Sequence, residues 1–292
     1  MSTSFLVRDT WKDTGLECLS MILMFLFRIV AFIVHLSGIN YFSFLLQYTF
    51  RPKKLMDVIE KSTDDLVVCS WLICCHRVQD NTFKLVSVDD LDVNVFVQNN
   101  KNYVCFYTKN PFYLFDLRKA QVDSGYIRRG LLQYVKQFYI IKQKLNLDKN
   151  PIIFTGHGAS GSIATLFSWF YSMPCQVIVF GAFPIGDAMY CEKLTCDLVE
   201  QDIMIHRYNS ELDILANFPQ QCQVDASPSS FMNYDFPGTT ITIQRDETIS
   251  FTSRLPLNAL VYSLPRYYYI AMKNRQTTLL NHITPSTTVY QQ

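Results

Sequence analysis

A short stretch in the middle of the chain carries the residues best suited to chemistry. Residues 151–169 read PIIFTGHGASGSIATLFSW, which predicts an apolar strand, a sharp glycine-rich turn and a helix. Such a turn can display a nucleophilic serine. The chemistry would be acyl transfer, in which the serine hydroxyl attacks an ester carbonyl, a histidine accepts its proton and a buried acid orients the histidine. In this chain the turn carries Gly158 where such a serine belongs.

The elements on either side of the turn must position it. Val-rich and Phe-rich stretches bounded by turn residues predict strands, and apolar residues at helical spacing predict helices. The predicted strands are 84–97, 102–108, 152–155, 176–180 and 203–208, with turns at residues 89–90 and 99–100. The predicted helices are 125–145, 163–171 and 53–76, and the last is either one helix or two helices broken near residues 62–63, with Asp64 and Asp65 available to cap the second. Strands that alternate with helices indicate an α/β fold with a mostly parallel sheet and helices on both faces.

The order of the motifs resembles the class 3 lipase family, the fungal-type triacylglycerol and diacylglycerol lipases. The family's turn, Gly-His-Ser-x-Gly-Gly, is similar to residues 156–161, and its Phe-Gly-x-Pro-x-x-Gly is similar to 180–186. Its Asn-x-x-Asp-x-Val-x-x-x-Pro is similar to 209–219. Shorter stretches that resemble the family lie at 104–108, 114–117 and 123–126. The resemblance covers Tyr103 to Pro219 and implies an α/β-hydrolase fold.

The resemblance assigns roles around the turn. Gly156, His157 and Gly158 would form the nucleophile elbow, with Gly158 at the nucleophile position and His157 packed beneath the turn. The backbone amides of Thr108 and Ala159 match the two donors of the oxyanion hole. Because a backbone amide does not depend on its side chain, the hole could persist where the nucleophile is absent.

The same resemblance suggests the partners of a nucleophile, in the chain order serine, aspartate, histidine. Asp213 matches the acid, and the alternative is an aspartate that only forms a turn. His282 follows in the correct order as the base, although the family's surroundings of that histidine are not recognisable, so an incidental surface histidine is the alternative. His206 lies inside an apolar strand and is expected to be a core histidine.

Two serines near the turn could replace the missing nucleophile. Ser160 would require the turn to shift by two residues, whereas Ser162 lies further into the helix and should point away from the carboxyl edge of the sheet. The alternative interpretation of Ser160 is that it replaces a glycine of the family and caps the helix through its hydroxyl. Without any substitute nucleophile, turnover falls by roughly a millionfold.

The N-terminal region forms a second informative feature. Residues Leu19–Ser37 are apolar over about the length that crosses a bilayer, although Arg28 falls at the centre. The segment is expected either to insert into a membrane or to pack on the main domain as a lid. Basic residues at 51, 53 and 54 favour a main domain on the cytosolic side. We therefore expect an N-terminal hydrophobic helical segment over 1–52 and one α/β-hydrolase-like domain over 53–292.

Composition narrows the remaining functions. The net charge is +1, with 26 basic and 25 acidic residues and no sustained basic run, which argues against nucleic-acid binding. Nine cysteines at irregular spacing, an odd number, indicate reduced thiols and an intracellular protein. No Cys or His spacing is typical of a metal site, and no cofactor is expected.

Three functions from different classes follow. The first is a pseudoenzyme of lipid metabolism, a lipase-like protein that binds lipid or acyl groups at a membrane without hydrolysing them. The second is an active ester hydrolase that uses Ser160, Asp213 and His282. The third is a membrane-anchored interaction protein in which the lipase-like fold serves only as a scaffold.

Overall fold

The computed structural model describes residues 62–75, 83–109, 119–147, 149–210, 234–243 and 267–273, together with residues 213, 216 and 265. Several predictions concern residues outside this part. These are the apolar segment Leu19–Ser37, the domain boundary after residue 52, the motif at 114–117 and His282.

A seven-stranded sheet forms the centre of the molecule, in the order β1-β2-β3-β6-β7-β9-β11. Its strands are β1 (Lys84–Val88), β2 (Leu91–Gln98), β3 (Lys101–Thr108), β6 (Ile152–His157), β7 (Cys175–Phe180), β9 (Ile203–Ser210) and β11 (Thr239–Ile243). The strands from β3 to β11 pair in parallel, and β1 and β2 add an antiparallel edge. The prediction of a mostly parallel sheet is confirmed.

Polar pairs make the turns of the antiparallel edge, as predicted. Asp89 has a positive φ of 48° between β1 and β2, and Asn99 and Asn100 have φ of 51° and 57° between β2 and β3. Aspartate and asparagine tolerate this left-handed region better than other residues with side chains. The first turn divides the stretch 84–97 into β1 and β2, and the second separates β2 from β3.

A small antiparallel sheet, in the order β10-β8-β5-β4, lies beside the main one. It consists of β4 (Lys119–Val122), β5 (Gly125–Arg128), β8 (Gly186–Asp187) and β10 (Tyr234–Asp235). The sequence predicts helix from residue 125, whereas the structure has strand until Arg128 and helix only from Arg129. Pairing explains the difference, because Ile127 lies opposite both Ala120 and Gly186.

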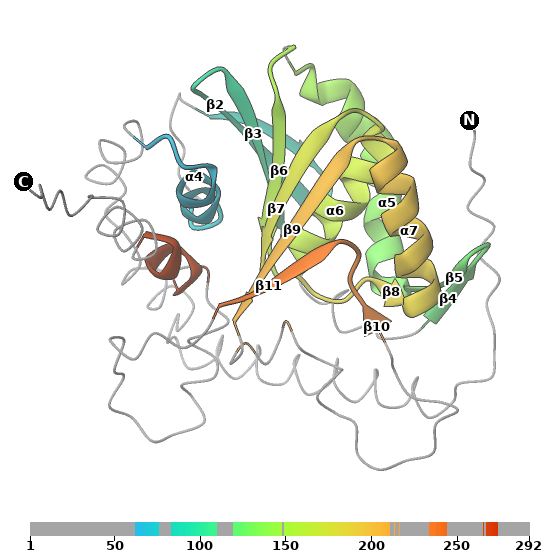
Figure 1. The fold of residues 1–292 in the computed structure, drawn as a ribbon. Coiled ribbons are helices and arrows are strands. Elements are labelled where there is room, and N and C mark those ends of the chain that lie inside the picture. Colours follow the sequence, from blue (N-terminus) through green and yellow to red (C-terminus); the bar gives the residue numbers. More distant parts are fainter. Residues whose placement is uncertain are drawn as a thin grey trace, which may run out of the picture.

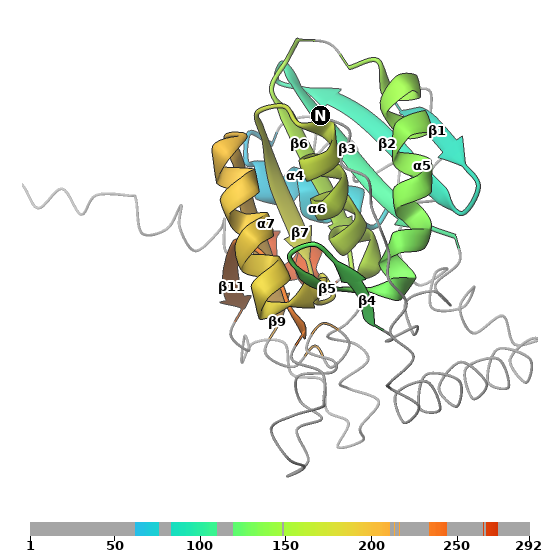
Figure 2. The same ribbon diagram turned by 90° about the vertical axis from the view of Figure 1, so that its right-hand side faces the viewer.

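Helices cover both faces of the main sheet. Helices α5 (Arg129–Leu145), α6 (Ala159–Tyr171) and α7 (Ala188–Glu200) lie on one face, and α4 (Asp65–Leu72) and the helical residues 267–273 lie on the other (Figures 1 and 2). Alternation along β3 creates two cores. Val104 and Phe106 pack with the helices of the first face, while Tyr103 and Cys105 pack with α4.

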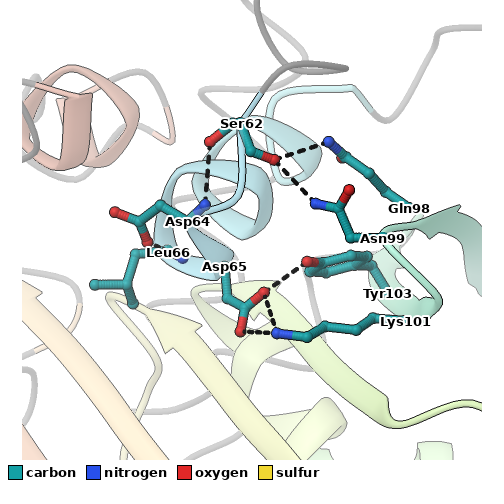
Figure 3. A network of polar contacts seen from close by, with 8 residues as sticks. All are labelled: Ser62, Asp64, Asp65, Leu66, Gln98, Asn99, Lys101 and Tyr103. Atoms are coloured by element: carbon teal, nitrogen blue, oxygen red, sulfur yellow. Dashed lines mark hydrogen bonds and ion pairs between the residues drawn. The ribbon is translucent and has the colours of Figure 1, made fainter.

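Helix α4 is fastened to the hairpin of β2 and β3 (Figure 3). Asp64 caps the helix, as the sequence suggested, since its Oδ1 accepts a hydrogen bond from the Leu66 amide at 2.9 Å. Asp65 accepts one from the Tyr103 hydroxyl at 2.6 Å and pairs with Lys101 at 2.7 Å. The network is completed at the hairpin by Ser62, Gln98 and Asn99. It lies at the amino end of β3, opposite the candidate site.

Candidate functional site

The candidate site lies at the carboxyl edge of the parallel strands, where α/β proteins commonly bind ligands. Strand register brings the ends of β3, β6, β7 and β9 to this edge. The residues at these ends are Thr108, His157, Phe180 and Ser210.

A single residue, Gly158, joins β6 to α6. Its φ of 60° and ψ of −128° lie in a region that residues with side chains enter only with strain. The amide of Gly158 donates to the Phe180 carbonyl at 3.0 Å, and its carbonyl accepts from the amides of Gly161 and Ser162. The predicted turn therefore exists, and a backbone conformation that favours glycine lies at the position that the resemblance assigns to a nucleophile.

Two neighbouring glycines permit the close approach of strand and helix. A Cβ at Gly156 would lie 2.5 Å from the Ser160 carbonyl oxygen, and one at Gly161 would lie 2.9 Å from the Ala182 Cβ. At Gly158 a Cβ would meet only the Phe183 ring, at 3.7 Å. There is room for a small side chain at Gly158, so spatial crowding does not explain the absence of a serine.

Ser160 and Thr108, both candidate residues, are in direct contact. Ser160 is in the first turn of α6 and 7% exposed, and its Oγ accepts a hydrogen bond from the Thr108 amide at 3.0 Å. The interpretation that Ser160 caps the helix is wrong, since the N-cap is Gly158 and the Ser160 hydroxyl contacts β3 instead. The amide that the resemblance assigns to a substrate oxygen thus binds an oxygen of the protein.

Neighbouring side chains fix this contact. The Thr108 hydroxyl and the Tyr134 hydroxyl of α5 are 2.6 Å apart and share a hydrogen bond.

Ala159, the other residue assigned to the oxyanion hole, is 2% exposed at the start of α6, where amides have no partner within the helix. Ser162 is buried, and its hydroxyl donates to the Phe183 carbonyl at 2.6 Å, which ties α6 to the segment after β7.

Asp213, the candidate acid, is buried just beyond β9. Its Oδ2 accepts a hydrogen bond from the Tyr268 hydroxyl at 2.6 Å, and its Oδ1 accepts one from the Ala216 amide at 3.0 Å. Burial and the negative charge of Asp213 raise the pKa of Tyr268 well above its ordinary value of 10.0. The phenol therefore remains protonated at neutral pH and acts as a donor to the carboxylate.

Two further residues, Arg207 and Gly181, lie around Asp213. Arg207 donates to the carbonyls of Ala182 and Ala216, at 2.9 and 2.8 Å, and burial lowers its pKa. Gly181 has a φ of 53°, and a Cβ there would lie 2.6 Å from the Asp213 Oδ2. The acid is thus enclosed by the protein from several sides.

The histidines of the described residues are His157 and His206. The His157 ring packs edge-on against Tyr268, with ring centroids 5.5 Å apart. His206 is half-buried in β9, between β7 and β11. His282, the candidate base, lies outside the described residues. The structure therefore brings Thr108, Gly158 and Ser160 to one edge with Asp213.

Tyr134, Arg207 and Tyr268 were not identified from the sequence as residues of this site. A tyrosine run at 267–269 is visible in the sequence, but nothing local indicates that its middle member bonds to Asp213, 55 residues earlier. No group of three or more His, Cys, Asp or Glu side chains suited to a metal occurs among the described residues. In the same part of the chain, no helix has the length and apolarity needed to span a membrane.

Comparison with known proteins gives likenesses in structure only. The sequence matches no known family model and no curated protein. Solved structures that are similar include a lipase from Rhizopus microsporus var. chinensis, with 16% identity and a TM-score of 0.44 over 68% of this chain and 77% of that one. MDLA from Penicillium cyclopium has 12% identity and a TM-score of 0.46 over 70% and 85%. Lip2 lipase from Yarrowia lipolytica has 15% identity and a TM-score of 0.41 over 58% and 67%.

These likenesses concern only the path of the chain. The α/β assignment rests on the strand order and on the two helical layers described above.

Proposed function

We propose that this protein is a lipase-like pseudoenzyme that binds lipid, or the acyl part of a lipid, at an intracellular membrane surface without hydrolysing it. One observation carries the proposal. At the elbow the nucleophile position is Gly158, and the Thr108 amide assigned to the oxyanion hole is bonded to Ser160. The site thus lacks an attacking oxygen at the nucleophile position, and one of its two assigned oxyanion donors is already bonded to the protein.

The magnitudes support an inactive site. Loss of the nucleophile from a working triad costs roughly a millionfold in turnover. Loss of one oxyanion donor costs roughly a further hundredfold to thousandfold. For hydrolysis through Ser160, its Oγ would have to leave the Thr108 amide, and a histidine would have to reach Asp213 beside Tyr268. These rearrangements make Ser160 the weaker candidate for a nucleophile.

The lipid-binding part of the proposal has its support in the sequence. Residues Leu19–Ser37 are apolar over about the length that crosses a bilayer. The basic residues that follow favour a main domain on the cytosolic side. An acyl chain is the ligand class that a lipase-like site would retain after the loss of its nucleophile.

The test combines binding and turnover on the full-length protein. We expect the protein to float with phosphatidylcholine vesicles containing diacylglycerol and to release no fatty acid above the rate of a Ser160→Ala variant. Release that disappears in Ser160→Ala would instead establish an active hydrolase. Absence of both vesicle binding and release would favour an interaction scaffold.

A further inference from the structure

Charge is distributed unevenly between two helices on the same face of the sheet. Helix α5 has four basic residues and no acidic one, namely Arg129, Lys136, Lys142 and Lys144. Helix α7 has three acidic residues and one basic one, namely Glu192, Asp197, Glu200 and Lys193. The whole chain has a net charge of only +1, so α5 is a local concentration of positive charge.

The outward side of α5 combines this charge with apolar surface. Its buried side consists of residues such as Tyr134, Phe138 and Ile141. We call the opposite side the α5 outer face, which comprises Lys136, Tyr139, Ile140, Gln143 and Lys144. These residues lie together because three-residue and four-residue spacings share a helix face. Tyr139 is 63% exposed and Ile140 is 41% exposed.

The lysines of α5 divide into two groups. Lys142 turns toward α6, where its Nζ donates to the Tyr171 carbonyl at 2.9 Å and lies over the Phe170 and Tyr171 rings. Lys136 and Lys144 form no ion pair with any described residue. Figure 2 shows α5 separated from α7 by α6. The two unpaired ammonium groups thus remain available to an external partner.

We propose that the α5 outer face docks on the surface of an anionic lipid bilayer; this rests on the proposed function. Each lysine close to such a surface contributes about 1 kcal/mol. The Tyr139 side chain is amphipathic, which suits the headgroup region of a bilayer. Burial of the apolar Ile140 side chain in that region is favourable because it removes the side chain from water. A phosphate backbone of nucleic acid would leave Ile140 without a favourable contact, so the apolar pair favours a bilayer.

The experiment uses full-length protein and two vesicle compositions, pure phosphatidylcholine and phosphatidylcholine with about 30% phosphatidylserine, an anionic lipid. We expect the wild type to prefer the anionic vesicles and Lys136→Gln/Lys144→Gln to lose this preference by about thirtyfold, since two lysines contribute about 2 kcal/mol. The matched control is Lys193→Glu on α7, which also lowers the net charge by two. It should retain the preference. Ile140→Ser should weaken binding to anionic vesicles without abolishing its salt dependence.

The outcomes separate this proposal from the proposed function. Equal binding of the wild type to both vesicle types would overturn docking by α5 and leave lipid binding intact. No binding to either type would overturn docking by α5, and failure to bind the diacylglycerol-containing vesicles as well would contradict both proposals. If the control and the α5 variant lose the preference for anionic vesicles equally, the preference depends only on net charge, and the assignment to α5 is overturned. Tighter binding of the wild type to heparin than to anionic vesicles would assign the face to another polyanion.

Discussion

The backbone at position 158 explains how the turn exists without a nucleophile. Glycine adopts a φ of 60° and ψ of −128° without the strain that a side chain adds. Gly161 differs, because its backbone is helical and its restriction is purely spatial. A Cβ at Gly161 would lie 2.9 Å from the Ala182 Cβ and 3.1 Å from the Gly156 carbonyl oxygen. The two glycines therefore separate backbone strain from crowding.

This pair gives the first prediction. Gly158→Ala should lower the free energy of unfolding by about 1–3 kcal/mol through strain alone, because Phe183 leaves room for the methyl group. Gly161→Ala should cost more, since atoms of the buried turn must move. Urea unfolding of both variants measures the difference. A Gly158→Ala variant as stable as the wild type, or a Gly161→Ala variant more stable than Gly158→Ala, would contradict this account.

Among the elements, α4 depends on the hairpin of β2 and β3. Asp65 accepts a hydrogen bond from the Tyr103 hydroxyl and forms an ion pair with the Lys101 ammonium (Figure 3). The two contacts differ in their exposure to water. The Lys101 and Asp65 side chains are 35% and 23% exposed, so water screens their ion pair. The Tyr103 residue is buried, which makes its hydroxyl bond harder to replace.

The second prediction concerns this difference. Tyr103→Phe should reduce the free energy of unfolding by about 1–3 kcal/mol, because Asp65 loses a donor that water replaces poorly. Lys101→Met should cost about 0–1 kcal/mol. Chemical unfolding of the two single variants and of the double variant tests the order. If Lys101→Met lowers the free energy of unfolding more than Tyr103→Phe does, the ion pair rather than the phenol holds α4 in place.

At the scale of the whole molecule, the sheet separates two apolar cores that contain several buried thiols. Burial raises the pKa of Cys105, Cys175 and Cys191 from 9.0 to about 12. These thiols stay neutral in the folded protein, whereas the same groups ionise near pH 9 in the unfolded chain. Their stabilising contribution is therefore complete below pH 9 and declines as the pH rises toward 12.

The third prediction follows from that sign. The free energy of unfolding should fall by about 1 kcal/mol per buried thiol between about pH 8 and pH 10, so by about 3 kcal/mol for these three. Urea unfolding with a reductant present measures it. Cys175→Ala should reduce the dependence on pH, while the same change at the exposed Cys196 should leave it unaltered. A stability independent of pH over this range would contradict the prediction.

The parts of the structure that sequence reasoning predicted are those with local signals. The glycines at 156, 158 and 161 define the turn, and polar pairs define the hairpins. The contacts that decide the state of the site are remote in sequence, since Ser160 binds Thr108 across 52 residues and Tyr268 binds Asp213 across 55. Local patterns do not encode such pairs. The small sheet was missed because its strands are short and because β8 and β10, which complete it beside the local hairpin of β4 and β5, are remote in sequence.

The most direct test of the central claim is labelling of the full-length protein with a fluorophosphonate serine-hydrolase probe. We expect the wild type to label no more than Ser160→Ala. We also expect Gly158→Ser/Ser160→Gly to label about a hundredfold faster than Gly158→Ser, because the Thr108 amide regains its role as an oxyanion donor. Labelling of the wild type that disappears in Ser160→Ala would contradict the account and establish Ser160 as a working nucleophile.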